Sequence, residues 1–245
     1  SICLLMQAAL PCLLFGSHDS SLLLKGGTNC DMAPQIDYTT KIFKPIAEKF
    51  GMHFDVDIRR RGYFPKGGGE VVITSHPTPG LVGLTDDLTV RGDLVRIYSR
   101  SFVAGGLPPH LANKVSQTVS RLLKQNFPNV EFQQDSLKEP EGAAIGSGLG
   151  VIVVAETSTG CLFGGSALGK PRSPAEDAGT EAAKELLDAL HCGGCVDQHL
   201  QDQLILLMTL AKGRSRILCG PLTLHTQTAI HVARLMTKAN LMWKH

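Results

Sequence analysis

The stretch from His53 to Thr74 constrains the fold more than any other part of the chain, because it predicts two strands joined by a glycine-rich turn. In its first half, apolar and charged residues alternate, which places Phe54, Val56 and Ile58 on one face of a strand. Its last five residues, EVVIT, are typical of a returning strand. The hairpin is therefore half-buried, with one face against the interior of the protein.

Helices and strands are mixed along the rest of the chain, which predicts α/β (α+β) layers with an inserted subdomain after a turn-rich boundary near residues 76–88. We expect a buried helix in 1–15 that is kinked near Pro11, and a helical stretch ending at Phe50 that Pro45 divides. The other expected helices are 111–126, 174–191 and two after residue 195; the other expected strands are 21–27, 95–102, 129–134, 150–157 and 160–166. Ser173 is the expected N-cap of helix 174–191.

Composition excludes some broad classes of protein. The formal net charge is only +2, so any contact with nucleic acid has to come from a local cluster of basic residues. Aromatic residues make up 5%, which argues against a sheet that stacks RNA bases. The seven scattered cysteines are typical of reduced thiols, and the lone CxxC pair of Cys192 and Cys195 is better explained as part of a turn than as a zinc or redox site.

The segment LTLHTQTAIH raises the question of why His225 stands where a strand, 219–225, is expected to end and a helix to begin. Thr226 and Thr228 are both plausible N-caps for that helix. A helix start offers free N–H groups and the positive end of a dipole, which attract phosphate. An imidazole beside a bound phosphoryl group can attack phosphorus. The alternative, a hydrogen-bonded core histidine, is the commoner role of a lone histidine, and we expect His231 to be a bystander on the helix.

A second cluster lies on the helix that follows residue 195. His199, Asp202 and Gln203 are three and four residues apart, so they are expected to share a face that could bind a sugar hydroxyl, an adenine edge or an imidazole. Leu200, Leu204, Leu207, Met208 and Ala211 form the expected buried stripe of the same helix. From the spacing alone, a solvated helix face is the favoured alternative for the polar cluster.

The basic loop RRRGYFPKGGG is a third candidate. Arg59, Arg60, Arg61 and Lys66 surround a glycine-rich turn, and the glycines permit a close approach of the backbone to a ligand. The loop could bind phosphate, for instance at an RNA end. A hairpin with solvated basic side chains explains the pattern equally well.

RGYFPKGGGEV resembles a signature of the RNA 3′-terminal phosphate cyclase family, and three further segments match that family in the same order: LKGGTNCDMAPQIDY, LQDQLILLM and GPLTLHTQTAIH. The first of these stands ahead of the signature and the other two follow it. The resemblance, which is to the animal form, covers essentially the whole chain but leaves out the N-terminal repeat. It implies a core of repeated βαβ-type units, here residues 1–87 and 195–245, with a smaller α/β domain inserted at 88–194.

The resemblance also implies an ATP-dependent reaction on RNA that ends in a 3′-phosphate. A histidine attacks the α-phosphorus of ATP, the resulting AMP passes to the RNA 3′-phosphate, and the 2′-hydroxyl then closes a 2′,3′-cyclic phosphate. The matching nucleophile is His225. The residues that match the nucleotide site are Gln7, Pro34, His199, Asp202 and Gln203. Position 199 is a departure, because the animal enzymes tend to carry Tyr there.

Further expectations follow from the same resemblance. Mg²⁺ would offset the charge of the triphosphate, although no residue is assigned to it as a ligand. RNA is the expected partner, the nucleus is the expected location with the cytoplasm as a second, and no membrane association is expected. The chain begins at Ser1 inside an apolar helix, so we expect it to be the C-terminal portion of a longer protein and to be inactive if the missing repeat is essential.

Two other functions are alternatives to the cyclase. One is a non-catalytic scaffold in ribosome assembly, a group that resembles the cyclase but lacks the histidine, so the presence of His225 favours the enzyme. The other is an enolpyruvyl-transferase-like enzyme with the same kind of repeated fold. That activity would need a basic anion pocket for a small substrate, and the sequence around His225 does not supply one.

Overall fold

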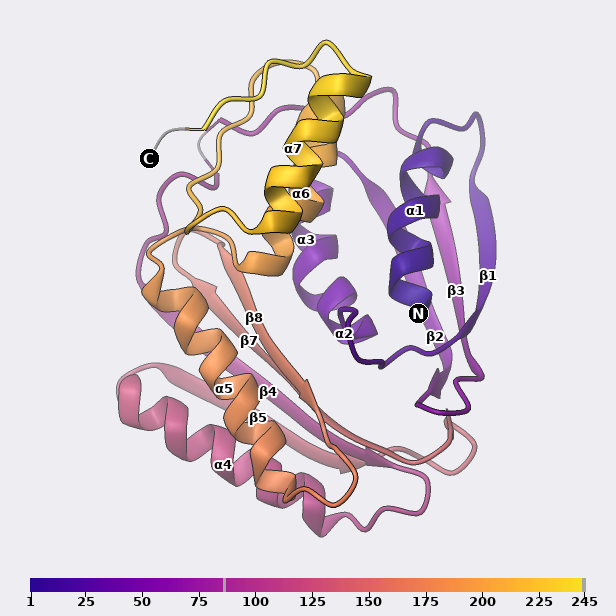
Figure 1. The fold of residues 1–245 in the computed structure, drawn as a ribbon, viewed down its shortest axis with the longest axis vertical. Helices are drawn as coiled ribbons and strands as arrows, with labels where there is room; N and C mark the ends of the chain where they lie inside the picture. The colour runs from indigo at the N-terminus through magenta and orange to yellow at the C-terminus, as the bar shows by residue number, and fades with distance from the viewer. Residues whose placement is uncertain (86, 244–245) are drawn as a thin grey trace.

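The computed structural model describes residues 1–85 and 87–243, which form helices packed around two four-stranded sheets (Figure 1). In chain order the elements are α1 (Ile2–Leu14), β1 (Ser20–Gly26), α2 (Ile36–Tyr38), the π-helical turn η1 (Thr39–Phe43), α3 (Lys44–Lys49), β2 (His53–Gly62), β3 (Gly69–His76), β4 (Leu94–Ala104), α4 (His110–Asn126), β5 (Glu131–Lys138), β6 (Ala144–Ile145), β7 (Gly148–Thr157), β8 (Leu162–Leu168), α5 (Ala175–His191), α6 (Gln198–Leu210) and α7 (Leu224–Met236). The predicted α/β class is confirmed.

The first sheet has the strand order β1-β3-β2-β6, and its centre is the predicted hairpin of β2 and β3. Helices α1 and α3 contact these strands and bury the apolar side chains of the hairpin. The prediction of a buried helix in 1–15 is correct for one face only. Leu10 is buried, whereas Leu4, Leu5 and Phe15 are about half exposed. Pro11 lies inside α1, which runs on to Leu14.

The predicted helix that ends near Phe50 contains a π-helical turn, η1, between α2 and α3. Pro45 stands in the first turn of α3, directly after η1. Because proline has no N–H group and its ring crowds the carbonyl of the preceding turn, the α-helical bonding pattern cannot pass through it unchanged. The prediction that Pro45 divides this helix is therefore confirmed, and the division is marked by the wider, π-helical turn η1.

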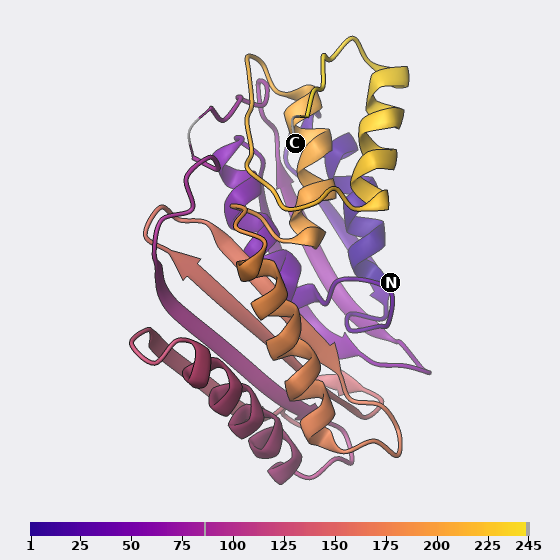
Figure 2. The same cartoon turned by 60° about the vertical axis from the view of Figure 1, so that its left-hand side comes forward.

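The second sheet has the order β5-β4-β7-β8, in which β4 and β5 are parallel and the other neighbours are antiparallel. Helices α4 and α5 lie side by side on one face of this sheet (Figure 2). On β8, Gly164 packs against Tyr38 and Ile42, which belong to the segment that leads into α3. Helix α5 begins at Ala175 with Pro174 at the N-cap, so the prediction that Ser173 is the N-cap is wrong by one residue.

The predicted strand at 219–225 is also wrong. In this segment the structure has one isolated bridge between Cys219 and Val196, after which the chain enters α7 at Leu224. A strand needs a neighbour with which to exchange hydrogen bonds, and the segment contains Pro221, which has no N–H to donate. The N-cap of α7 is Thr223, whose side chain accepts a hydrogen bond from the Thr226 nitrogen, and not Thr226 or Thr228 as expected.

Pairing within the first sheet bears on the expected domain division. Strand β6, which lies inside the predicted insertion 88–194, pairs with β2 through Arg61 and Gly62. The division into 1–87, 88–194 and 195–245 stays a prediction. None of the helices in the described part of the chain combines the length and the apolar character needed to cross a bilayer.

At the far end of β3, His76 makes the stability of the hairpin depend on pH. Its ring nitrogens lie 3.0 Å from carboxylate oxygens of Asp19 and of Asp55, and these hydrogen bonds raise the pKa of His76 above its ordinary 6.5, Asp55 having the larger effect. The same contact lowers the pKa of Asp55 below 3.8. The stabilisation from His76 is complete below 6.5 and is lost as the pH rises through the raised value, whereas that from Asp55 is lost only in acid.

We therefore expect the free energy of unfolding to decrease from about pH 5 to about pH 8 by more in the wild type than in His76→Asn, as measured by denaturant titration at both values. His53→Asn, at an exposed position near the start of β2, is the matched control and should keep the wild-type pH dependence. The same slope in His76→Asn and in the wild type would contradict the assignment.

Candidate active site

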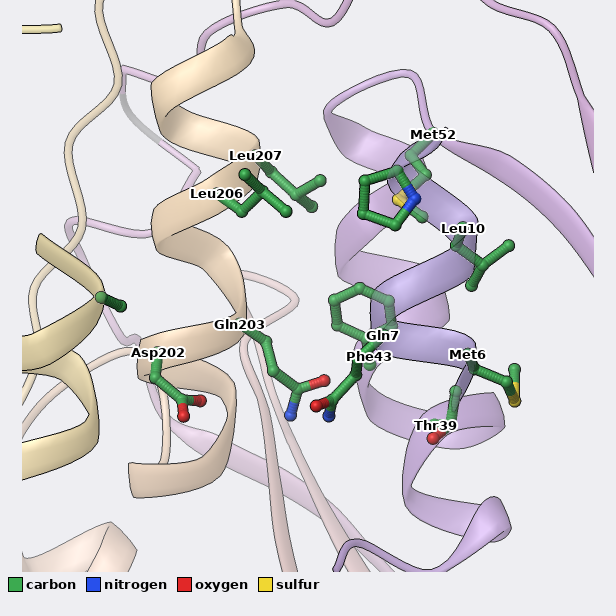
Figure 3. Close-up of a pocket in the computed structure, with 12 residues that line it drawn as sticks. Met6, Gln7, Leu10, Thr39, Phe43, Met52, Asp202, Gln203, Leu206 and Leu207 are labelled. Atoms are coloured by element: carbon green, nitrogen blue, oxygen red, sulfur yellow. The ribbon is translucent and has the colours of Figure 1, made fainter. Parts of the chain in front are cut away.

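A cavity of about 200 Å³ lies between α1, η1, α6 and α7. Its walls are mostly apolar, and its polar side chains include Gln7 from α1 and Asp202 and Gln203 from α6. Figure 3 shows the amides of Gln7 and Gln203 pointing toward one another from facing helices. The structure thus brings together three of the five residues that sequence analysis assigned to a nucleotide site.

Asp202 is the acidic side chain of this cavity. Its burial raises the pKa of the carboxyl group, while hydrogen bonding to backbone N–H groups and the nearby rings of His225 and His199 act in the opposite direction. The ring of His225 thus contributes to the electrostatic environment of the Asp202 carboxyl group. Gln203 donates a hydrogen bond of 2.7 Å from Nε2 to the backbone oxygen of His199, which fixes the side chain along the helix.

His225 lies in the first turn of α7 and is exposed to solvent. The sequence prediction placed it at a strand end; the structure places it just after the N-cap, where the first N–H groups of a helix have no partner within the helix. Ala229, one turn further along α7, lines the cavity. The imidazole of His225 itself does not line the cavity.

His199 takes a different environment from Asp202 and Gln203. Its Nε2 lies 2.6 Å from Oε1 of Glu185 on α5, and the ring meets Tyr38 edge-on with the centroids 5.9 Å apart. The hydrogen bond to Glu185 raises the pKa of His199. The expected shared face is therefore only partly formed, because His199 is turned toward α5 and does not line the cavity. Pro34, half-buried in the loop before α2, does not line it either.

Asp197 was not singled out in the sequence, yet it organises the start of α6. Its carboxylate caps the helix by accepting hydrogen bonds from the backbone nitrogens of His199 and Leu200, at 3.0 and 2.8 Å. It also accepts bonds from the hydroxyl of Tyr38 at 2.6 Å and the nitrogen of Gly164 at 2.8 Å. An aspartate directly before a helix is a recognisable capping signal, and this signal could have identified it.

Gln201 is a second residue that sequence analysis missed. Its Oε1 accepts hydrogen bonds from the Thr226 hydroxyl at 2.6 Å and from the Thr223 nitrogen at 3.1 Å, and its Nε2 donates to the Gly220 oxygen at 3.3 Å. These contacts attach the segment before His225 to α6. No local pattern in the sequence could have found them, because they join two helices.

The predicted cluster of exposed basic residues on the glycine loop is only partly correct. Arg59 is exposed, but Arg61 is 5% exposed and forms a bidentate pair with Asp37, with distances of 2.6 and 2.8 Å. Arg61 Nε also lies 3.0 Å from Oε1 of Glu139. Arg61 is therefore a structural residue and is not available to bind phosphate.

Among the described residues, no three His, Cys, Asp or Glu side chains gather closely enough to hold a metal ion. Cys192 and Cys195 are both free thiols, the first exposed and the second buried.

Comparison with known proteins gives a consistent result. The model of the family described as RNA 3′-terminal phosphate cyclase matches residues 1–242. A protein of Dictyostelium discoideum named "Probable RNA 3′-terminal phosphate cyclase" is 42% identical over 241 residues, which cover 98% of this chain and 55% of that protein. Proteins named "RNA 3′-terminal phosphate cyclase" from Drosophila melanogaster and Pyrobaculum aerophilum are 36% and 33% identical, over 97% and 95% of this chain and 65% of each relative. The chain thus spans 55–65% of the length of these relatives.

Proposed function

This chain belongs to the RNA 3′-terminal phosphate cyclase family, and we propose that it carries the nucleotidyl-transfer site of an ATP-dependent enzyme that converts an RNA 3′-phosphate into a 2′,3′-cyclic phosphate. The observation that supports this most is the position of His225 in the first turn of α7, a helix that borders the cavity lined by Asp202 and two facing amides.

The proposed reaction has three balanced steps. A ring nitrogen of His225 attacks the α-phosphorus of ATP, so that a P–N bond forms, the bond to the β-phosphate oxygen breaks and pyrophosphate leaves. An oxygen of the RNA 3′-phosphate then attacks the same phosphorus and releases the histidine. Finally the 2′-hydroxyl attacks the 3′-phosphorus, loses its proton and expels AMP as the ring closes.

The side chains of the site suit different parts of the nucleotide. The mostly apolar cavity with the amides of Gln7 and Gln203 suits an uncharged base, because amides can donate and accept hydrogen bonds without adding charge. The free N–H groups at the start of α7 suit the phosphates. Asp202, the carboxylate of the cavity, would hold or orient the imidazole of His225 during the attack.

Mg²⁺ fits this arrangement only as an ion that arrives with the triphosphate. The described residues offer no metal-binding cluster, and Asp202 is the one carboxylate among the cavity-lining residues. Mg²⁺ commonly binds through one or two carboxylates together with substrate phosphates and water, so such an ion would need no dedicated protein cage. When bound, it would offset negative charge on the phosphates.

The proposal is tested with a single-stranded RNA that carries a 3′-phosphate, incubated with the protein, ATP and Mg²⁺. Conversion to a cyclic phosphate makes the end resistant to phosphatase. An RNA with a 2′-deoxy terminal nucleotide is the matched control, since it can accept AMP but cannot cyclise. Lack of both cyclisation and AMP transfer, in this chain and in a protein as long as its relatives, would contradict the proposal and favour a non-catalytic scaffold.

Gln201 provides a prediction about how His225 is positioned. Gln201→Leu leaves the Thr226 hydroxyl, which is fully buried, and the Thr223 N–H without their acceptor. We expect a loss of about 1–3 kcal/mol in the free energy of unfolding. We also expect covalent labelling by α-labelled ATP to slow by at least about 10-fold, because a small misplacement of a reacting group has a large effect on rate.

Gln198→Leu, at an exposed position on the same helix, is the control for the helix itself. Labelling of Gln201→Leu at the rate of Gln198→Leu would show that Gln201 does not position His225.

A further inference from the structure

The turn between β2 and β3 presents an exposed aromatic side chain, Phe64, and an exposed cation, Lys66, neither of which has a visible structural role in the protein. The Tyr63 oxygen accepts a hydrogen bond of 2.8 Å from the Gly67 nitrogen, which leaves Phe64, Pro65 and Lys66 at the tip. Phe64 is 81% exposed, and Lys66 is exposed without an ion pair to any described residue. A single exposed aromatic residue is common, so the surroundings of this one have to decide whether it has a function.

The base of the turn is held by very close backbone packing. A Cβ atom on Gly62 would lie 2.3 Å from the Gly69 nitrogen and 2.6 Å from the Gly26 oxygen, so no larger residue fits between these strands. On the other side, the Tyr63 nitrogen donates to the Ile145 oxygen at 3.1 Å, and a Cβ on Gly68 would lie 3.1 Å from the Ile145 side chain. The tip therefore stands on a base that contacts both β1 and β6.

The buried ring of Tyr63 attaches the same turn to the interior of the protein. Tyr63 is 3% exposed and packs on Phe102 with the ring centroids 6.3 Å apart. Because the turn is fixed by its backbone and by this buried ring, Phe64 contributes nothing visible to its stability. A ring that is presented on a fixed base loses little conformational freedom when a ligand binds, which favours recognition.

The turn is also attached to a neighbouring loop of the chain. Its residue Tyr63 bridges to Asn29, and the Thr28 nitrogen donates to the Gly62 oxygen at 3.0 Å, so the turn is attached to the loop that leads to Pro34. Arg60, near the end of β2, is half-buried, and its buried Nε has no hydrogen-bond acceptor among the described residues.

We propose that this tip binds a nucleotide of single-stranded RNA, with a base stacked on Phe64 and a backbone phosphate on Lys66. The inference rests on the proposed function and adds a contact for the RNA. An aromatic side chain with a neighbouring cation is the pattern by which proteins hold single-stranded nucleic acid without reading its sequence. A protein partner would need a broader apolar surface than one exposed ring to form a stable interface.

The test is the affinity of the protein for a fluorescent single-stranded RNA with a 3′-phosphate, measured by anisotropy without ATP. Phe64→Ala should weaken binding by about 5- to 100-fold, the range expected when a stacked base loses its aromatic partner, whereas Phe64→Trp should keep or improve it. Phe15→Ala, another exposed phenylalanine at the end of α1, is the matched control and should bind as the wild type does. Lys66→Ala should lower the dependence of log Kd on log salt concentration by about 0.7, as for one lost phosphate contact.

The outcomes separate this inference from the proposed function. Selective weakening in Phe64→Ala supports the RNA contact, even in a protein that fails to cyclise RNA. Affinities of Phe64→Ala and Phe15→Ala that both equal the wild type would overturn it, as would a wild-type protein that binds no RNA. Equal weakening in both variants would also overturn it, because exposed aromatic surface in general would then be responsible.

Discussion

His225→Ala is expected to reduce covalent labelling of the protein by α-labelled ATP at least about 10³-fold, as is usual when the nucleophile of a covalent mechanism is removed. The imidazole is exposed in the first turn of α7, so its removal leaves no cavity and no buried group without a partner. The free energy of unfolding should therefore stay within about 0.5 kcal/mol of the wild type. The label, read after denaturing electrophoresis, should be acid-labile, as expected for a P–N bond.

His231→Ala is the matched control. His231 is exposed on the same helix, further from its N-terminus, and should keep full labelling. A wild-type label that persists in His225→Ala would assign the nucleophile to another residue. If the wild-type chain is not labelled, the two variants have to be compared in a protein of the full length of the relatives, since this chain spans only part of them.

Periodicity within single segments predicted most of the helices and strands. The alternation in β2 and the spacing of apolar residues in α6 are local consequences of which face is buried, so a single sequence contains them. The segment 219–225 looked equally apolar, but a strand is defined by its neighbour, and the sequence holds no sign of which strand is adjacent. The start of α5 was misplaced by one residue, because Pro174 has a non-helical backbone conformation with ψ at 143° and therefore stands at the N-cap.

The candidate site was predictable where its residues share one helix turn and unpredictable where they depend on contacts between elements. Asp202 and Gln203 line the cavity as neighbours on α6, but His199 is drawn to Glu185, which belongs to α5. Gln201, on the same helix, was passed over because its partners lie on α7. The resemblance to the cyclase family supplied a role for His225 that spacing alone left open.

Arg61→Ala is expected to destabilise the protein by about 3–5 kcal/mol, because it removes one partner of a buried ion pair and leaves the other uncompensated. The guanidinium group is bidentate to Asp37, which is 2% exposed, and also contacts Glu139. Burial by itself would raise the pKa of Asp37, but the hydrogen bonds and charge of Arg61 outweigh it and hold that pKa below its ordinary value. Without Arg61, burial would favour the protonated acid, so the loss should be largest at neutral pH, where the wild-type Asp37 is ionised, and smaller in acid.

Two further variants show whether the geometry or only the charge of Arg61 is required. Arg61→Lys keeps the positive charge but not the planar fork that bonds both oxygens of Asp37, so it should recover only part of the lost stability. Arg59→Ala removes an arginine two residues earlier whose side chain is 54% exposed and whose ion pairs to Asp57 and Glu70 span 3.4 and 3.6 Å, so it should change stability by less than about 1 kcal/mol. Denaturant titration of the three variants separates the two arginines, and equal effects of Arg61→Ala and Arg59→Ala would contradict the buried pair. The comparison also decides which variants can test RNA binding by the basic loop. A variant that neutralises Arg61 along with its neighbours would be destabilised, so a weaker affinity for RNA in that variant would not show the loss of a phosphate contact.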